Sequence, residues 1–518
     1  MGVRGTLVGI AMCVVPAALL AACSLGDDDD GESGPTTDAA TTSEAASDDG
    51  STDGTSSSVA DDTSTSGVES GTDDPSADGS GPISFASQIE PIIERSCANC
   101  HTGSGPGTQH VRLDNASLVS LSAPGLAPVI ETGFMPPWPA GGDSPEYQHD
   151  WSLTTDEIAT LLAWTDAGGP LDVPDDHVIE PPPDGGVRLD DPDLDVLSRG
   201  SYDGTAGQPD EYRCFVYDMG LDEGGYITAM DFRPQREQVV HHAVGFLVDA
   251  ADVVDFDEVD GADGQGGWTC FGFSPSPTAE LVYAWAPGQA ANRYPDGTGL
   301  RVEAGDVFVI QTHYHFDVEA PADQSSFELD VVVDSDAEAD DMIAIDVSTY
   351  LGPAEIPCTS DESGPLCDRN AAVADAVSKY GEAGFFANGI LAICGQSPDD
   401  YADMTDGIAS STCDQRVNGI GSIIGIFGHQ HELGSSFRMT LNPDTPEERV
   451  LLDIPRWDFD WQLIYEPVED IRLERGDVIR MECEWDRSLR DPELEPAYVI
   501  WSDGTDDEMC FASVTTRP

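Results

Sequence analysis

The stretch VFVIQTHYH, residues 307–315, begins with four apolar residues and ends with two histidines separated by one residue. An unbroken apolar start is typical of a buried β-strand, and side chains two residues apart lie on the same face of a strand. His313 and His315 are therefore expected to present two imidazoles to one side of a sheet. This strand predicts both a β-rich fold and a metal site.

Comparable apolar runs occur on both sides of this strand, separated by Gly, Pro and Asp turns. They are Gln238–Val248, Phe327–Val333 and Ile420–Phe427. Their length and spacing predict a β-rich region from about residue 195 to residue 518.

Histidines are concentrated in a few places. Seven of the ten histidines are His101, His241, His242, His313, His315, His429 and His431. His429 and His431 share one face of an extended strand, as His313 and His315 do. Adjacent His241 and His242 point to opposite faces of a regular strand, so joint ligation requires a strand end or a local distortion. Three histidine pairs in one region favour metal binding over isolated buried histidines.

The histidine pairs suit copper or zinc, because no cysteine thiolate lies beside them. A thioether would favour copper, and Met509 near the C-terminus is the candidate. A zinc hydrolase is the weaker interpretation, since methionine suits zinc poorly and the chain has no His-Glu-x-x-His arrangement around these pairs.

Cys97-Ala98-Asn99-Cys100-His101 is the attachment motif of a c-type haem. The two thiols form thioethers, and His101 becomes the proximal iron ligand. The alternative is a redox pair of cysteines that a histidine happens to follow. Apolar residues at helical spacing in Ile83–Arg95 precede the motif, which favours the haem interpretation.

A second helix, which starts at the capping box Thr154-Thr155-Asp156-Glu157, closes this part of the chain. Two helices that bracket a haem motif resemble a small all-α cytochrome c domain, here residues 83–178. Met135, in a proline-stiffened loop, is the expected sixth iron ligand. His110 and His149 are rivals, and Met135 packing against the haem without binding the iron is the other alternative.

The N-terminus indicates export. Leu7 to Leu20 is apolar but too short to cross a bilayer, which fits a signal peptide over residues 1–22. Leu20-Ala21-Ala22-Cys23 resembles a bacterial lipoprotein cleavage box, which implies that Cys23 carries lipid; an ordinary secretory signal is the alternative. We therefore expect an exported protein, lipid-anchored to the bacterial envelope in the periplasm or at the cell surface, that meets the membrane only through this anchor.

Composition limits the remaining choices. The chain has 518 residues, enough for about three domains, and a formal net charge of −76, which excludes nucleic-acid binding. Residues 23–82 contain 16 acidic residues and neither Lys nor Arg, so they are expected to form a disordered acidic tether. Residues 179–194 are expected to form a Pro-rich linker.

Eight cysteines remain after Cys13, Cys23 and the haem motif are set aside. They are Cys214, Cys270, Cys358, Cys367, Cys394, Cys413, Cys483 and Cys510. An even number in an oxidising compartment predicts disulfides, although their connectivity does not follow from these positions.

The histidine and methionine motifs occur in the order found in copper type II, ascorbate-dependent monooxygenases, which include peptidylglycine α-hydroxylating and dopamine β-monooxygenases. They are His241-His242, Gln311-Thr312-His313-Tyr314, Gly428-His429-Gln430-His431 and Asp507-Glu508-Met509-Cys510. The chain resembles this family over about 320 residues, from about residue 195 to the end.

This resemblance implies two all-β jelly-roll-like sandwiches, residues 195–350 and 351–518, each with one copper ion. One copper, held by His241, His242 and His313, stores an electron, and Gln311 lies near it. The other, held by His429, His431 and Met509, is the catalytic copper. The resemblance also implies the disulfides Cys483–Cys510 and Cys214–Cys270. His315 is an extra histidine that either replaces His313 or lies behind it, and the matching motif favours His313. The other four cysteines can pair in three ways.

Departures from the family pattern concern the substrate. Phe427 stands where peptide-hydroxylating members have an arginine that holds the substrate carboxylate, and Phe511 and Ser513 replace Asn and Tyr. The resemblance therefore implies a more apolar pocket and a small organic substrate other than peptidylglycine. Residues 359–411, with a helix expected at 370–380, have no evident counterpart. They form either an insertion near the cleft or surface decoration.

The combined prediction is a monooxygenase that hydroxylates a C–H bond with dioxygen and contains two copper ions and one haem c. The fused haem domain is expected to supply electrons, and an ascorbate-like reductant or another cytochrome is the expected redox partner. The alternative is a non-catalytic haem and copper electron-transfer lipoprotein.

Overall fold

The computed structural model describes residues 83–518, except residues 104, 183–187, 190, 206–209, 272–275, 277–278, 288, 317–320, 382–385 and 418. The predicted signal peptide, Cys23 and the acidic tether lie outside the described residues, as does part of the predicted linker. Among the helices that the structure describes, none combines the length and the apolar character needed to cross a membrane.

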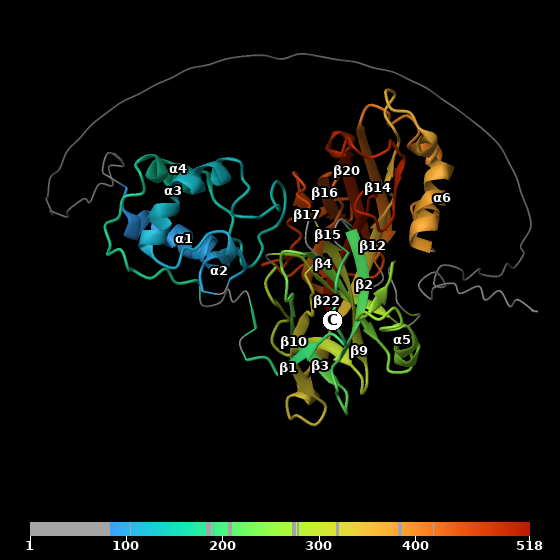
Figure 1. Cartoon of the computed structure of the whole chain (residues 1–518), viewed down its shortest axis with the longest axis horizontal. Coiled ribbons are helices and arrows are strands. Elements are labelled where there is room, and N and C mark those ends of the chain that lie inside the picture. Colours follow the sequence, from blue (N-terminus) through green and yellow to red (C-terminus); the bar gives the residue numbers. More distant parts are fainter. Residues whose placement is uncertain are drawn as a thin grey trace, which may run out of the picture. The chain divides into compact units, whose positions relative to one another are not determined.

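Helices occupy residues 85–166 (Figure 1). They are η2 (Phe85–Ile89), α1 (Glu90–Ser96), α2 (Ala98–His101), η3 (Pro106–Gln109), α3 (Ala116–Glu131) and α4 (Thr155–Asp166). Phe85 and Trp164 pack 5.9 Å apart, measured between ring centroids, in the core that these helices share. The capping box predicted from sequence is present, because the Thr154 and Glu157 side chains each bind the other residue's backbone N–H. Both predicted helices are therefore confirmed.

Two sheets face each other in the first β-rich part of the chain, colored green to yellow in Figure 1. One contains β1 (Leu194–Leu197), β10 (Ser326–Val333), β3 (Gly225–Arg233), β8 (Thr298–Val302) and β11 (Ile343–Ala344) in spatial order, with β7 (Asn292–Arg293) beside β3. The other contains β5 (Trp268–Thr269), β2 (Asp210–Asp218), β9 (Val307–His315), β4 (Val240–Val248) and β6 (Glu280–Trp285). Apolar side chains from both sheets, such as Ile310 and Phe327, form one core, so the two sheets make a sandwich.

A second pair of sheets follows. One contains β12 (Asp346–Gly352), β22 (Cys510–Arg517), β15 (Gly421–His429) and β18 (Ile464–Tyr465), with β19 (Arg472–Leu473) beside β15. The other contains β14 (Ile408–Arg416), β20 (Val478–Asp486), β16 (Gly434–Leu441) and β17 (Arg449–Ile454). Ile426 and Met481, one from each sheet, are fully buried in a shared core. The prediction of a β-rich region is thus confirmed.

Shorter elements complete the described chain. They are β13 (Glu355–Ile356), which pairs with β21 (Val499–Ile500), and the helices α5 (Val253–Val259), α6 (Arg369–Tyr380), α7 (Phe386–Ile393), η4 (Ala339–Asp341), η5 (Pro365–Cys367), η7 (Pro398–Asp400) and η8 (Arg487–Leu489). The helix expected at residues 370–380 is α6. At its end, Tyr380 contacts Phe271 with ring centroids 5.1 Å apart and lines a cavity together with Asp210 and Tyr212. This segment therefore reaches between the two sandwiches.

Four disulfides connect the eight remaining cysteines. Cys214–Cys270 and Cys483–Cys510 are the two pairs that the family resemblance implies. The pairs left open are Cys358–Cys367 and Cys394–Cys413, which close short loops at the two ends of the segment that contains α6 and α7.

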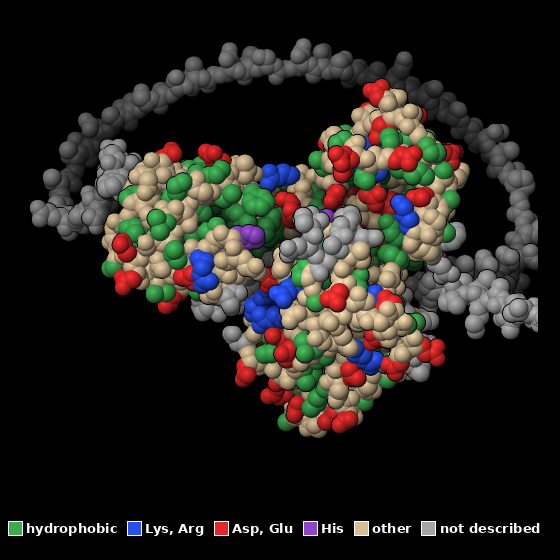
Figure 2. Space-filling view, in the orientation of Figure 1, with side chains coloured by type: hydrophobic (Ala, Val, Ile, Leu, Met, Phe, Trp, Pro, Cys, Tyr) green, Lys and Arg blue, Asp and Glu red, His purple; other side chains and the backbone are tan. Residues whose placement is uncertain are grey.

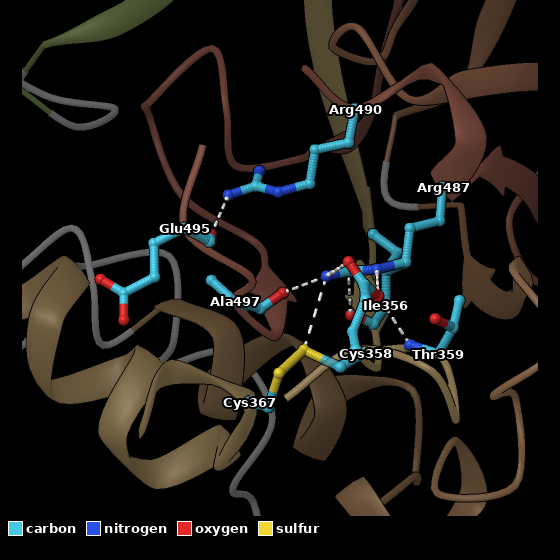
Figure 3. The surroundings of a disulfide bond; sticks show 9 residues. Ile356, Cys358, Thr359, Cys367, Arg487, Arg490, Glu495 and Ala497 are labelled. Atoms are coloured by element: carbon cyan, nitrogen blue, oxygen red, sulfur yellow. Dashed lines mark hydrogen bonds and ion pairs between the residues drawn. A yellow bond between two sulfur atoms is a disulfide. The ribbon is translucent and has the colours of Figure 1, made fainter. Parts of the chain in front are cut away.

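A buried arginine holds the first of these loops in place (Figure 3). The guanidinium of Arg487 donates to both carboxylate oxygens of Glu362 and to the carbonyl oxygen of Ala497, and it lies 3.5 Å from the sulfur of Cys358. The loop is therefore fixed by a charge pair as well as by its disulfide.

The segment between α3 and α4 is built into the core of the second sandwich. Trp138 and Tyr147 each pack against Tyr465, with ring centroids 5.4 and 5.0 Å apart. The hydroxyl of Tyr147 donates to the carbonyl oxygen of Leu451 at 2.7 Å. Because this segment directly follows Met135, the helical part of the chain is attached to the second sandwich through the Met135 loop.

Replacing Tyr147 tests this attachment. Tyr147→Phe loses one hydrogen bond and should cost about 1 kcal/mol, whereas Tyr147→Ala also loses a buried ring and should cost about 3–5 kcal/mol. Limited proteolysis should then cut Tyr147→Ala within residues 139–151 faster than it cuts the wild type or Tyr147→Phe. Equal cleavage rates in all three proteins would contradict the attachment.

Candidate metal centre

His242 of β4 and His313 of β9 lie directly opposite each other in an antiparallel pair. The register of β4 shifts between Val240 and His242, which is a β-bulge, and His241 occupies it. This is the local distortion that joint use of adjacent histidines requires. Candidate ligand atoms of His241, His242 and His313 all lie within 4.8 Å of one another.

The Nδ1 atoms of this first cluster converge. Nδ1 of His242 lies 3.1 Å from Nδ1 of His241 and 3.4 Å from Nδ1 of His313. Three ring nitrogens at these distances can bind one ion through Nδ1. His315 lies outside this group; its side chain is 46% exposed and lies 3.6 Å from Asp210.

Asp210 fixes the orientation of His313. Nε2 of His313 donates to the Asp210 carboxylate at 2.8 Å, which leaves Nδ1 facing His242. Tyr212, opposite His313 on β2, stacks on its ring with centroids 4.3 Å apart and planes 3° from parallel. The sequence pattern does not predict the role of Asp210, because its contact with His313 depends on the pairing of β2 with β9.

Burial keeps the imidazoles neutral. It lowers the pKa of His241 to about 3, with a further contribution from the neighbouring histidines, and it lowers the pKa of His242 as well. Burial also lowers the pKa of His313, although Asp210 opposes the shift. A neutral ring is the form that binds metals, so little proton release is needed.

The second cluster combines His429, at the end of β15, with His431 and Met509. The ring centroids of His429 and His431 are 5.0 Å apart, and Met509 lines the same cavity. Nδ1 of His429 donates to Oε1 of Gln462 at 2.5 Å, and Nδ1 of His431 donates to the backbone carbonyl of Asp507 at 3.1 Å. Both rings therefore keep Nε2 for a ligand. Burial lowers the pKa of both, that of His429 to about 4.

A buried carboxylate connects the two chain segments of this cluster. Glu508 accepts hydrogen bonds from the backbone N–H groups of His431, Leu433 and Met509 and from the indole of Trp485, at 2.7–3.1 Å. Burial raises the pKa of Glu508 to about 8, and the four donors act to lower it. Glu508 thus sets the position of the Met509 backbone relative to His431.

His242 of the first cluster and all three residues of the second line one cavity of about 70 Å³, and the rings of His242 and His429 approach to 6.0 Å between centroids. Its walls are mostly apolar and include Val244, Phe246, Leu281, Trp285, Phe427 and Phe511. Gln311, which the family resemblance places near the first cluster, also lines it. The expectation of an apolar pocket agrees with these walls.

The predicted haem motif lies on and beside α2. Nδ1 of His101 donates to the carbonyl oxygen of Val111 at 2.9 Å, which leaves Nε2 available. The thiols of Cys97 and Cys100 are free, and burial raises their pKa to about 12 and about 11. Met135 is half-buried, and its N–H donates to the carbonyl of Val129. Its rivals His110 and His149 are exposed.

Glu508→Gln tests whether Glu508 supports the second cluster through its hydrogen bonds, and not merely through its negative charge. The amide places an N–H₂ against groups that are themselves donors, so at least one buried donor loses its acceptor, at a cost of about 1–3 kcal/mol. The midpoint of thermal unfolding should fall, and the second cluster should retain metal less firmly. Glu432→Gln, an exposed neighbour, is the control; equal behaviour of the two variants would argue against this role.

No family model matches the chain. Part of it is similar to peptidyl-glycine alpha-amidating monooxygenases A and B of Xenopus laevis, with 27% and 26% identity over 166 residues. The match covers 30% of this chain but only 16% and 18% of those two proteins. Among solved structures, PNGase F, a glycosylasparaginase from Flavobacterium meningosepticum, is 7% identical over 62% of this chain and 95% of that chain, with a TM-score of 0.23. This TM-score is too low to identify a shared fold.

Proposed function

We propose that the chain is a copper-dependent monooxygenase that uses dioxygen to hydroxylate a C–H bond of a small apolar molecule. One observation carries the proposal: an Nδ1 cluster of three histidines reaches, through His242, the cavity that a second cluster of two histidines and a methionine lines. The partial similarity to two amidating monooxygenases supports it.

The residues present fit copper. Neutral imidazoles without thiolates suit copper, and a methionine thioether favours copper over zinc. His241, His242 and His313 would hold one ion, and His429, His431 and Met509 the other. Each copper would supply one of the two electrons that bring dioxygen to the level of a hydroxylating oxidant.

Residues behind the ligands hold the rings in place. Asp210 orients His313, while Gln462 and the Asp507 carbonyl orient His429 and His431. Because each of these partners engages one ring nitrogen, the other nitrogen is directed at the ion before the ion arrives. These contacts thus lower the free-energy cost of ordering the ligand side chains when the ion binds.

The cavity favours a small, apolar substrate. Phe427 and Phe511 lie within 6.3 Å of each other, measured between ring centroids, and both line it next to His429. No arginine or lysine is among the described residues that line it. A carboxylate would therefore enter without a cationic partner, which burial makes unfavourable. Peptidylglycine does not fit this proposal.

Cys97, Cys100 and His101 would hold a c-type haem, with Met135 as the sixth ligand. Two free thiols and a histidine whose Nδ1 is already engaged by Val111 fit this group. The haem would pass single electrons to the three-histidine copper. The four disulfides indicate an oxidising compartment, and we propose that Cys23 carries the lipid anchor.

Metal analysis tests this function directly. The purified protein should contain one iron, as haem c, and two copper ions, while Met509→Ala should retain one firmly held copper and His242→Ala should weaken the other. Oxygen uptake should then depend on an apolar substrate. Zinc in place of copper would contradict the proposal, and copper with no substrate-dependent oxygen uptake would favour the electron-transfer lipoprotein.

Asp210→Asn tests the orientation of His313. Loss of the carboxylate charge should weaken copper binding at the three-histidine site by about 10–100-fold, measured by competition with a copper chelator. Glu211→Gln is the matched control, since Glu211 is the next residue of β2 but binds Tyr202 and Thr205 instead. Unchanged affinity in Asp210→Asn would refute the role.

A further inference from the structure

The loop between β17 and β18, residues 455–463, contacts the Met135 loop at one end and both histidine clusters at the other. Arg456 donates to the carbonyl oxygens of Thr132 and Gly133 at 3.0 and 3.2 Å. These two residues and Phe134 directly precede Met135. The β17–β18 loop is thus bound to the loop that carries the expected haem ligand.

Two aromatic side chains of the same loop lie between this contact and the three-histidine cluster. Trp461 packs edge to face on Phe134, with centroids 6.4 Å apart and planes 71° apart. Phe459, joined to Trp461 through the backbone of Asp460, stacks on His241 at 4.6 Å with planes 28° apart. Two aromatic rings of one short loop therefore connect Phe134 with a ligand of the three-histidine cluster.

The loop is held firmly enough to keep this arrangement. The backbone N–H of Trp461 donates to the carbonyl oxygen of Asp458 at 3.1 Å. Nε2 of Gln462 donates to the carbonyl oxygen of Phe459 at 2.8 Å, while its Oε1 accepts from His429. The backbone that positions Phe459 is consequently tied to the second cluster as well.

We propose that Phe134, Trp461 and Phe459 form the electron route from the haem to the three-histidine copper. The proposal rests on the function proposed above and adds the path to it. In the step, ferrous haem iron is oxidised to ferric iron and cupric copper at the three-histidine site is reduced to cuprous copper. One electron moves, and no bond or proton is transferred.

The geometry favours the three-histidine site as the acceptor. Phe459 stacks on His241 with ring centroids 4.6 Å apart, but it meets His431 edge-on with centroids 6.1 Å apart. Electron tunnelling is faster through covalently linked and closely packed atoms than across a gap of similar length. The better-packed ring contact therefore leads to His241.

The test is anaerobic photoreduction of the haem in the full-length protein loaded with cupric copper and free of substrate. Reoxidation of the haem is followed by its visible absorption, and loss of cupric copper by electron paramagnetic resonance. In the wild type, reoxidation should be first-order and independent of protein concentration. If the haem stays reduced and the cupric signal is unchanged, the haem is not the electron donor to the copper. This outcome would overturn that part of the proposed function independently of the variants.

Variants test the path separately. Trp461→Leu and Phe459→Leu should slow reoxidation by about tenfold or more, because each removes packed ring atoms and opens a gap. Trp461→Phe should restore most of the rate. Trp151→Leu is the matched control: Trp151 packs on Trp138 at 5.0 Å in the same attachment but lies off the path. The rate of haem reoxidation in Trp151→Leu should stay within about twofold of the wild-type rate, since this variant leaves the contacts of the β17–β18 loop in place.

A structural role alone predicts different results. If Trp461→Leu retains the wild-type haem spectrum, copper content and cupric signal and still transfers electrons at the wild-type rate, the path is wrong. Equal slowing in Trp151→Leu would also overturn it, because the effect would then come from a loosened attachment. Among the described residues, the ring contact of Trp461 is with Phe134 and its backbone hydrogen bond is with Asp458, so its variant tests the path even if Phe459→Leu binds copper poorly.

Discussion

Pairing of β4 with β9 places His242 opposite His313, and the bulge beside it turns His241 to the same side. A register shifted by one residue would send each of these rings to the other face of the sheet. A second pairing, that of β2 with the other edge of β9, positions Asp210. The first cluster is thus a consequence of strand register, and register is in turn maintained by the apolar core beneath β9.

Buried imidazoles are unfavourable unless their polar atoms have partners. The chain meets this requirement in the same way at four of its histidines. His101, His313, His429 and His431 each engage one nitrogen with an oxygen of Val111, Asp210, Gln462 or Asp507. Burial lowers the pKa of the clustered rings and keeps them neutral, while the partners select which nitrogen remains. Burial therefore sets the charge state of the imidazoles, and their oxygen partners set which ring nitrogen faces the cluster.

Local patterns predicted the elements that depend on local sequence. Val307–His315 is strand β9 with the expected bounds, and the helix expected at 370–380 is α6. The motifs also identified the histidines that the fold gathers. Asp210, Gln462 and Glu508 received no role, because each acts through a contact set by long-range pairing or by a loop. For the same reason, the partners of Cys358 and Cys394 required the structure: four cysteines in one region carry no spacing rule that selects a connectivity.

The acidic surface bears on how electrons enter. Acidic side chains are spread over the face shown in Figure 2, and the chain remains strongly acidic even without the 16 acidic residues at positions 23–82. Such a surface repels an anionic reductant such as ascorbate, most strongly at low ionic strength. The proposed haem domain would avoid this encounter, because its effective concentration at the proposed copper site would be set by the chain rather than by diffusion. The surface would then favour a cationic electron donor for the proposed haem, since attraction between opposite charges raises the rate of association.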